Sequence, residues 1–481
     1  MPFSSFAQPH ASTLRAIFDE PDWREVVADG TLDAARRDIL APPKTANVFA
    51  LPVAQLVAIN EGKVRRLIAS GERDEDRLLA ALGTWPSEWP ESVPVRLAFL
   101  GVSLSLRCNM QPRCIYCNQR AVEQRMTLDD WKALMRSLVP ENGEGTYVYV
   151  TGGEPLLFGE GLWGPDGLVR VAADAGAACN LNTNALGLTP RAAIGLVRAG
   201  LGRIHISLDS HRPEVEDAIH QRSGRWRQIV RGLCNLQVAK AVLGAQHPLI
   251  HINCVLTRLN ASDFPAFLRF VLGMKPLVEG GVGQDLDMHL IPVGGHQNRD
   301  LRLSPEDYVR LFTESWEQAD AVWQEYLAER DVPADKRLPL HRQQPFMSPF
   351  HRVQQRGDVE EWARHAAEGL PAALSLTQRC YVAPTQGFVL PDGAQYWCGG
   401  HTVSRPEPLG SVLTHSLREN IRRSLHEMAS LPADQCSTCA GATQAINQIV
   451  EAQLKGKIAE WLKPDEQTPS EHPTPDERAF E

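Results

Sequence analysis

Short apolar runs alternate with amphipathic segments through the middle of the chain, from about residue 95 to residue 330. The apolar runs predict strands, and the segments between them carry apolar residues at helical spacing. Predicted strands cover residues 96–102, 146–150, 178–182, 203–208, 249–256 and 286–291, and predicted helices include 127–138, 190–199, 225–242 and 305–330. Strands joined by helices pair in parallel. Six such units favour an α/β fold with a partial (β/α)6, TIM-like barrel, although an open sheet stays an alternative.

The regions on either side of this core show other patterns. Residues 1–94 predict a mostly helical N-terminal unit, 331–375 a connector or lid, and 376–463 a small α+β unit that carries cysteines. Residues 464–481 are polar and rich in proline, which predicts a disordered tail. No run of about 18 apolar residues predicts a membrane span, and the first residues lack a signal-peptide pattern. We therefore expect a cytoplasmic protein with no membrane partner.

A polar motif follows each predicted strand of the core. The motifs are the loop 103–120, TGGEP at 151–155, NTN at 182–184, SLDS at 207–210, TRLN at 257–260 and PVGG at 292–295. Barrel enzymes build their sites at this end of the strands. Six motifs at corresponding positions predict one ligand pocket.

The loop after the first strand holds Cys108, Cys114 and Cys117 with the spacing C-x5-C-x2-C. Three thiolates in one loop can hold three corners of an iron–sulfur cluster, leaving the fourth iron open to a ligand. Zinc is the rival interpretation, because C-x2-C is also half of a zinc site. The three cysteines therefore predict a metal centre, whose metal the spacing leaves open.

Composition adds two limits to this interpretation. The chain has 481 residues, 58 acidic and 49 basic side chains, and a formal net charge of −9, which offers no support for nucleic-acid binding. Clustered thiols in a reducing compartment favour metal ligation over disulfides. Of the 10 cysteines, Cys179, Cys234 and Cys254 lie in apolar contexts, which predicts core packing.

The three cysteines, the GGEP motif and the SLDS motif together resemble the radical S-adenosylmethionine (radical SAM) superfamily over about residues 95–300. The resemblance implies a [4Fe–4S] cluster on Cys108, Cys114 and Cys117, with S-adenosylmethionine chelating the fourth iron. It also implies a cofactor-binding wall, formed by Tyr116, Gly152, Gly153, Glu154, Asn182, Asn184, Ser207 and Asp209. The family's usual first gap is three residues, and here it is five, which changes the shape of the loop.

A second cysteine group lies in residues 376–463. Cys380 and Cys398 flank a Pro-Asp-Gly sequence that predicts a β-hairpin, and Cys436 and Cys439 form a C-x2-C pair. Spacing alone fits four-thiolate zinc as well as an iron–sulfur cluster. The segment resembles the SPASM module of radical enzymes, or its shorter twitch form, which implies one auxiliary [4Fe–4S] cluster on these four cysteines.

The resemblance implies an enzyme that cleaves S-adenosylmethionine reductively and abstracts a hydrogen atom from its substrate. We expect a radical SAM oxidoreductase or maturase acting on a ribosomally made peptide, supplied with electrons by a flavodoxin- or ferredoxin-type reductant. One alternative is a dehydrogenase or epimerase of a small molecule such as a sugar or antibiotic precursor. Another is a zinc-stabilised binding protein without catalysis. No residue is assigned here as the group that reacts with substrate.

Overall fold

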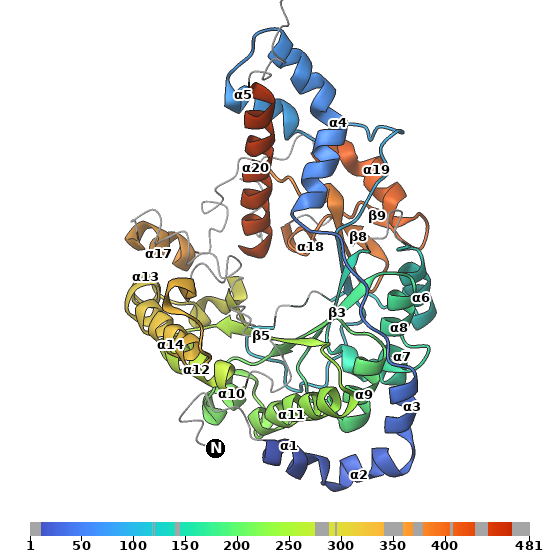
Figure 1. Ribbon diagram of the computed structural model, residues 1–481, viewed down its shortest axis with the longest axis vertical. Helices are drawn as coiled ribbons and strands as arrows, with labels where there is room; N and C mark the ends of the chain where they lie inside the picture. Colours follow the sequence, from blue (N-terminus) through green and yellow to red (C-terminus); the bar gives the residue numbers. More distant parts are fainter. Residues whose placement is uncertain are drawn as a thin grey trace, which may run out of the picture.

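A nine-stranded sheet with the strand order β6-β5-β4-β3-β2-β1-β7-β8-β9 forms the centre of the protein (Figure 1). The computed structural model describes residues 11–117, 119, 121–139, 145–274, 288–293, 296–340, 359–368, 379–404, 407–428 and 441–463. The first six strands are β1 (Phe99–Ser103), β2 (Tyr147–Thr151), β3 (Ala178–Thr183), β4 (Arg203–Ser207), β5 (Leu249–Leu256) and β6 (Met288–Pro292). They pair in parallel in chain order. The predicted α/β fold with a partial (β/α)6 barrel is thus confirmed.

Helices connect the strands and pack on the outer face of the barrel (Figure 1). They are η1 (Pro155–Phe158), α6 (Leu128–Arg136), α7 (Glu160–Trp163), α8 (Leu168–Asp174), α9 (Pro190–Arg198), α10 (Pro213–Ile219), α11 (Arg225–Leu243), η2 (Ala261–Asp263) and α12 (Phe264–Gly273). Apolar strand side chains such as Val148, Leu181 and Ile204 are completely buried. Burial of apolar surface between this sheet face and the helices is the main stabilising contribution to the barrel.

The predicted helix 305–330 is divided into three parts. It consists of α13 (Pro305–Arg310), a π-helical turn η4 (Leu311–Ser315) and α14 (Trp316–Ala328). Within the turn, the Thr313 hydroxyl donates a hydrogen bond of 2.8 Å to the Val309 carbonyl. Such side-chain bonds compete with the regular helix ladder, and the apolar pattern alone does not reveal them.

The C-terminal unit extends the same sheet. Strand β7 (Gln386–Val389) pairs in parallel with β1, and β8 (Ala394–Tyr396) and β9 (Gly410–Ser411) follow in antiparallel pairings. The predicted hairpin is confirmed, and its turn contains Gly393 at a φ of 84°, a conformation that favours glycine. The other elements are η7 (Ala383–Thr385), α18 (His401–Ser404), α19 (Leu417–Met428) and α20 (Gly441–Leu462). Sequence patterns separated this unit from the barrel and did not reveal the β1–β7 pairing.

The N-terminal unit is helical, as predicted, but its helices pack in two places. Helices α1 (Ala11–Phe18), α2 (Pro21–Ala28) and α3 (Thr31–Arg37) lie against the barrel helices α9 and α11. Helices α4 (Ala50–Ala69) and α5 (Glu75–Leu82) pack against α20 at the opposite end of the molecule (Figure 1). The described connector residues form η5 (Ala334–Lys336) and α17 (Val359–Glu368), which packs on α13. A short helix, η3 (His296–Leu301), follows β6.

None of the helices in the described residues combines the length and the apolar character that crossing a membrane requires.

Candidate active site

The cysteine loop leaves the end of β1 and carries three partly buried free thiols, Cys108, Cys114 and Cys117. The Cys117 amide donates a 3.0 Å hydrogen bond to the Cys114 carbonyl, and the Ile115 amide donates one of 3.1 Å to Ile219 at the end of α10. Burial raises the pKa of Cys108, and the charges of Glu154, Cys114 and Cys117 raise it further. A bound metal ion favours the thiolate form and offsets this repulsion.

The Gly-Gly turn after β2 packs directly on the backbone of this loop. The amides of Gly153 and Glu154 donate hydrogen bonds of 2.6 and 2.8 Å to the carbonyls of Ser105 and Arg107. A Cβ atom on Gly153 would lie only 1.9 Å from the Arg107 carbonyl oxygen, and Gly152 has a φ of 130°. The sequence interpretation gave these glycines a close approach to the cofactor. The structure gives them a close approach to the cysteine loop.

Glu154 connects the ends of β2 and β3. Its side chain is buried, and it accepts hydrogen bonds of 2.6 Å from the Thr183 hydroxyl, 2.8 Å from the Asn184 amide and 2.9 Å from the Leu156 amide. Burial raises the pKa of Glu154, whereas these three donors oppose that rise. Glu154 thus holds the two strand ends in register beneath the cysteine loop.

Three further predicted residues lie at the ends of β3 and β4. The Asn184 side-chain amide lies 3.8 Å from the Cys108 sulfur, and Asn182 accepts a 3.0 Å hydrogen bond from Asn253 on β5. Ser207 ends β4 and is partly exposed. Asn184 therefore contacts the predicted metal site, and the contacts of Asn182 and Ser207 with a cofactor stay predictions.

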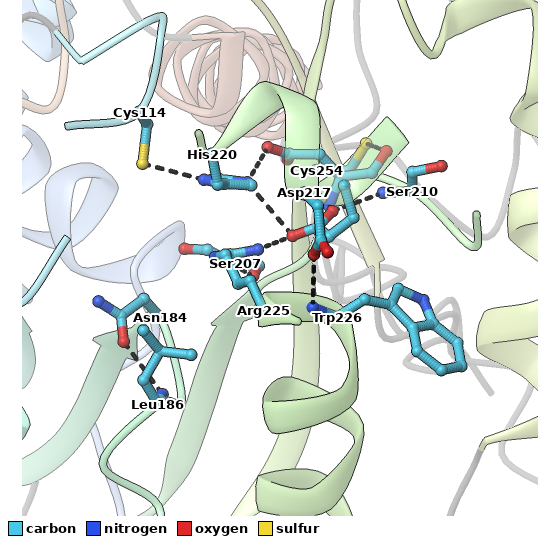
Figure 2. Close-up of polar contacts among 12 residues, drawn as sticks. Cys114, Asn184, Leu186, Ser207, Ser210, Asp217, His220, Arg225, Trp226 and Cys254 are labelled. Carbon is cyan, nitrogen blue, oxygen red and sulfur yellow. Dashed lines mark hydrogen bonds and ion pairs between the residues drawn. The ribbon is translucent and has the colours of Figure 1, made fainter. Parts of the chain in front are cut away.

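A buried network supports the loop from the side of β4. The Tyr116 hydroxyl donates a 2.8 Å hydrogen bond to Oδ2 of Asp209, and Nε2 of His220 lies 2.8 Å from the same oxygen. Nδ1 of His220 lies 2.9 Å from the Cys114 sulfur (Figure 2). Oδ1 of Asp209 accepts from the Val255 amide at 2.7 Å. Both oxygens of this carboxylate have partners within the chain, and Asp209 is 1% exposed. Its expected contact with the cofactor stays a prediction.

Charges in this network compensate one another. Glu216 is buried, forms an ion pair with Arg225, and accepts the amides of Asp209 and Ser210 at 2.8 and 2.9 Å. Ligand atoms of Asp209, Glu216 and His220 lie within 4.8 Å of one another. Because the Arg225 guanidinium already pairs with Glu216, this group fits an internal ion cluster better than a metal site. Burial opposes protonation of His220, but its bonds to Asp209 and Cys114 raise its pKa to about 9.

The inner face of the barrel is polar and aromatic. Tyr149, His205, His251 and His289 come from β2, β4, β5 and β6, with successive ring centroids 5.2, 4.7 and 6.3 Å apart. Burial lowers the pKa of His205 to about 3 and that of His289 to about 4, and it also lowers that of His251. These imidazoles are uncharged at neutral pH. The inner face therefore offers hydrogen-bonding rings to a ligand rather than fixed charges.

The second cysteine group is described in part. Cys380 precedes η7, and its sulfur lies 3.8 Å from the side-chain amide nitrogen of Asn447 on α20. Burial raises the pKa of Cys380, while hydrogen bonds from the Val382 and Ala383 amides oppose the rise. Cys398 follows β8 and is partly exposed. Cys436 and Cys439 lie outside the described residues, so the four-cysteine site stays a prediction.

Sequence reasoning missed several residues of this region. It did not identify His220, Arg225 or the inner-face residues His205 and His251. Two of these residues could have been found from the sequence. His205 and His251 each interrupt an otherwise apolar strand, and alternate residues of a strand face the same side of the sheet. Cys179 and Cys254 are completely or almost completely buried, and Cys234 packs against the same core, which confirms the predicted core role.

Comparison with known proteins agrees with this arrangement. Residues 102–271 match the model of the radical SAM superfamily. GTP 3',8-cyclase from Petrotoga mobilis is 30% identical over 187 residues, which cover 36% of this chain and 52% of that protein. The same enzyme from Streptomyces coelicolor is 38% identical over 181 residues, which are 36% of this chain and 49% of the relative. PqqA peptide cyclase from Bradyrhizobium diazoefficiens is 30% identical over 188 residues, or 38% of this chain and 45% of that protein. The chain thus spans about half the length of the curated relatives it matches.

Two solved structures are similar at low identity. Native anSMEcpe with bound AdoMet has a TM-score of 0.45 and 15% identity, covering 69% of this chain and 82% of that chain. Streptococcus suis SuiB bound to the precursor peptide SuiA has a TM-score of 0.44 and 13% identity, covering 72% of each chain.

The cysteine loop, the GGEP turn and strands β2 to β5 fall within the matched segment, which begins near the end of β1. The family implies a [4Fe–4S] cluster and S-adenosylmethionine as cofactors. Residues 102–271 of this chain thus form a segment that matches the radical SAM superfamily.

Proposed function

We propose that Cys108, Cys114 and Cys117 hold a [4Fe–4S] cluster whose open iron takes S-adenosylmethionine. The observation that carries the proposal is the set of three free thiols in one loop, which the Gly-Gly turn holds over the strand ends. Three thiolates fit such a cluster, and the described part of the loop carries no histidine that would favour zinc. When bound, the two cofactors supply a 5′-deoxyadenosyl radical that removes a hydrogen atom from the substrate.

The chain's own residues would bind and orient these groups. Gly152 accepts a hydrogen bond from the Gln119 side chain through its carbonyl, which joins the turn to the end of the cysteine loop. We assign the cofactor wall to Tyr116, Gly152, Gly153, Asn182, Asn184 and Ser207. Glu154 and Asp209 support this wall from beneath, since their carboxylates are buried and hydrogen-bonded within the chain.

The test is anaerobic reconstitution followed by measurement of 5′-deoxyadenosine with dithionite as reductant and no substrate. We expect brown protein that forms 5′-deoxyadenosine, and Cys114→Ala should lose both the cluster and this product. A matched control is Cys179→Ala, because Cys179 lies in the core away from the loop. Colourless, zinc-loaded protein, or activity retained in Cys114→Ala, would refute the proposal.

We further propose that the substrate is a ribosomally made peptide and that the reaction is an oxidation or crosslinking. Similarity to PqqA peptide cyclase supports a peptide. The small-molecule alternative draws support from the similarity to GTP 3',8-cyclases. The two alternatives separate when candidate peptides and nucleotides are each added to the assay, since only a true substrate acquires a product of changed mass.

We also propose an auxiliary [4Fe–4S] cluster on Cys380, Cys398, Cys436 and Cys439, accepting an electron from the substrate radical. Cys380 has the surroundings of a metal ligand, with the Val382, Ala383 and Asn447 donors on its sulfur. The reconstituted chain should contain about eight irons, and Cys380→Ala about four. Wild-type protein with only about four irons would refute the second cluster.

A further inference from the structure

The contact between His220 and Cys114 carries an inference beyond the identity of the cluster ligands. His220 follows α10 and is completely buried. Its Nδ1 lies 2.9 Å from the Cys114 sulfur (Figure 2), and its Nε2 lies 2.8 Å from Oδ2 of Asp209. The imidazole thus bridges a predicted cluster ligand and a buried carboxylate.

The surrounding bonds fix the position of the ring. Asp209 is itself held by the Tyr116 hydroxyl at 2.8 Å and the Val255 amide at 2.7 Å. The Tyr116 ring packs edge-on against the imidazole, with centroids 5.6 Å apart and planes at 81°. A ring held by the carboxylate on one side and by Tyr116 on its face has little freedom to turn away from Cys114.

The direction of the hydrogen bond follows from the proposed function, on which this inference rests. A cysteine that ligates iron carries no proton on sulfur, so only Nδ1 of His220 can supply the hydrogen of this contact. Hydrogen bonds to cluster sulfurs help to set the reduction potential. One-electron reduction increases the negative charge on the sulfurs, and a donor stabilises the reduced state more than the oxidised one.

We propose that His220 is a positioning residue that donates a hydrogen bond to the Cys114 thiolate and thereby raises the reduction potential of the radical SAM cluster. The electron itself comes from an external one-electron donor, which dithionite replaces in the test. Loss of this hydrogen bond leaves the thiolate in place but makes the same electron harder to add.

Two variants separate the two ring nitrogens. In His220→Asn the amide nitrogen can occupy the place of Nδ1 and still donate to Cys114. In His220→Gln it reaches only the place of Nε2 and donates to Asp209. His247→Gln is the matched control, because that ring contacts the Gly202 carbonyl at 3.2 Å and none of the cysteines of the loop.

The measurement is a redox titration of the reconstituted chain, followed by electron paramagnetic resonance. The signal that shifts when S-adenosylmethionine is added belongs to the cluster with the open iron. His220→Gln should disfavour its reduction about tenfold or more, which is 59 mV for a one-electron couple. His220→Asn and His247→Gln should stay close to wild type.

A measurement on the wild type covers the case in which His220→Gln fails to hold its cluster. Protein grown with 15N-labelled histidine should show a nitrogen hyperfine coupling to the reduced cluster. An unchanged potential in cluster-loaded His220→Gln, or a wild-type cluster without this coupling, would overturn the role of His220 alone. Wild-type protein that binds no [4Fe–4S] cluster would overturn the proposed function as well.

Discussion

Replacing Gly153 by alanine tests whether the turn after β2 holds the cysteine loop in position. An added Cβ would lie 1.9 Å from the Arg107 carbonyl oxygen and 2.5 Å from its carbon. Ordinary contact begins at 3.4 Å, so the loop and the turn would have to separate by about 1.5 Å. Both sides of this contact are backbone, and no side chain can turn aside to relieve it.

The displaced segment ends one residue before Cys108. Overpacking of this kind costs about 1–3 kcal/mol of unfolding free energy. A misplacement of about 1 Å at a reacting centre can cost about a hundredfold in rate. We therefore expect Gly153→Ala to fold with reduced stability and to form 5′-deoxyadenosine about a hundredfold more slowly per bound cluster.

The assay measures iron content, 5′-deoxyadenosine per cluster, and unfolding by denaturant under anaerobic conditions. Gly456→Ala is the control, because a Cβ on that glycine of α20 meets nothing within 4 Å. It should match the wild-type rate and gain up to about 1 kcal/mol from helix propensity. Wild-type iron content and rate in Gly153→Ala would refute the argument that the glycine is needed for this close approach.

Three further predictions concern stability. Trp23→Phe removes the 3.1 Å hydrogen bond from the buried indole to Asn235. Denaturant titration should show that the free energy of unfolding falls by about 1–3 kcal/mol. An unchanged midpoint would mean that this bond does not hold α2 to α11. Glu154→Gln places an amide donor opposite the Thr183, Asn184 and Leu156 donors and should cost about 1–3 kcal/mol of unfolding free energy. Glu61→Gln, at a half-buried glutamate on α4, should cost much less. Burial lowers the pKa of His205 in the folded chain to about 3, below its ordinary value of 6.5. The contribution of this neutral histidine to the free energy of unfolding is therefore complete above pH 6.5. Below that pH the unfolded chain binds a proton that the folded chain does not, and the free energy of unfolding falls by about 1.4 kcal/mol per pH unit. His205→Phe should flatten this slope between pH 6.5 and 5, and an unchanged slope would contradict the buried, neutral assignment.

The barrel could be predicted from the sequence because each of its strands is a short local run rich in apolar residues, which become buried on one face of the sheet. Each of the six strands was located, and the cysteine loop was identified from three residues within ten positions. The polar motifs were also predicted to meet at one end of the sheet, and the hydrogen bonds of Glu154 with Thr183 and Asn184 join two of them. These features depend on short-range patterns and on the geometry common to parallel sheets.

The remaining features depend on contacts between distant parts of the chain. Nothing local indicates that β7 pairs with β1, because a hairpin is equally consistent with an independent domain. The resemblance of the SLDS motif placed Asp209 beside the cofactor, but it gave no sign of the partners that hold this carboxylate. These partners lie on the cysteine loop, just after α10 and on β5. His220 lies in a helical segment with no motif of its own, and only the fold brings it to Cys114.

Pairing between β1 and β7 has a consequence for how the chain is made. Phe99 pairs with Gln386, a separation of 386 − 99 = 287 residues. At about 5–20 residues per second, a ribosome needs about 15–60 s to add them. During that time the strand that leads into the cysteine loop is an unpaired sheet edge, and such edges pair readily with other chains. We expect truncations before residue 386 to aggregate through β1 even when the barrel segment itself is intact.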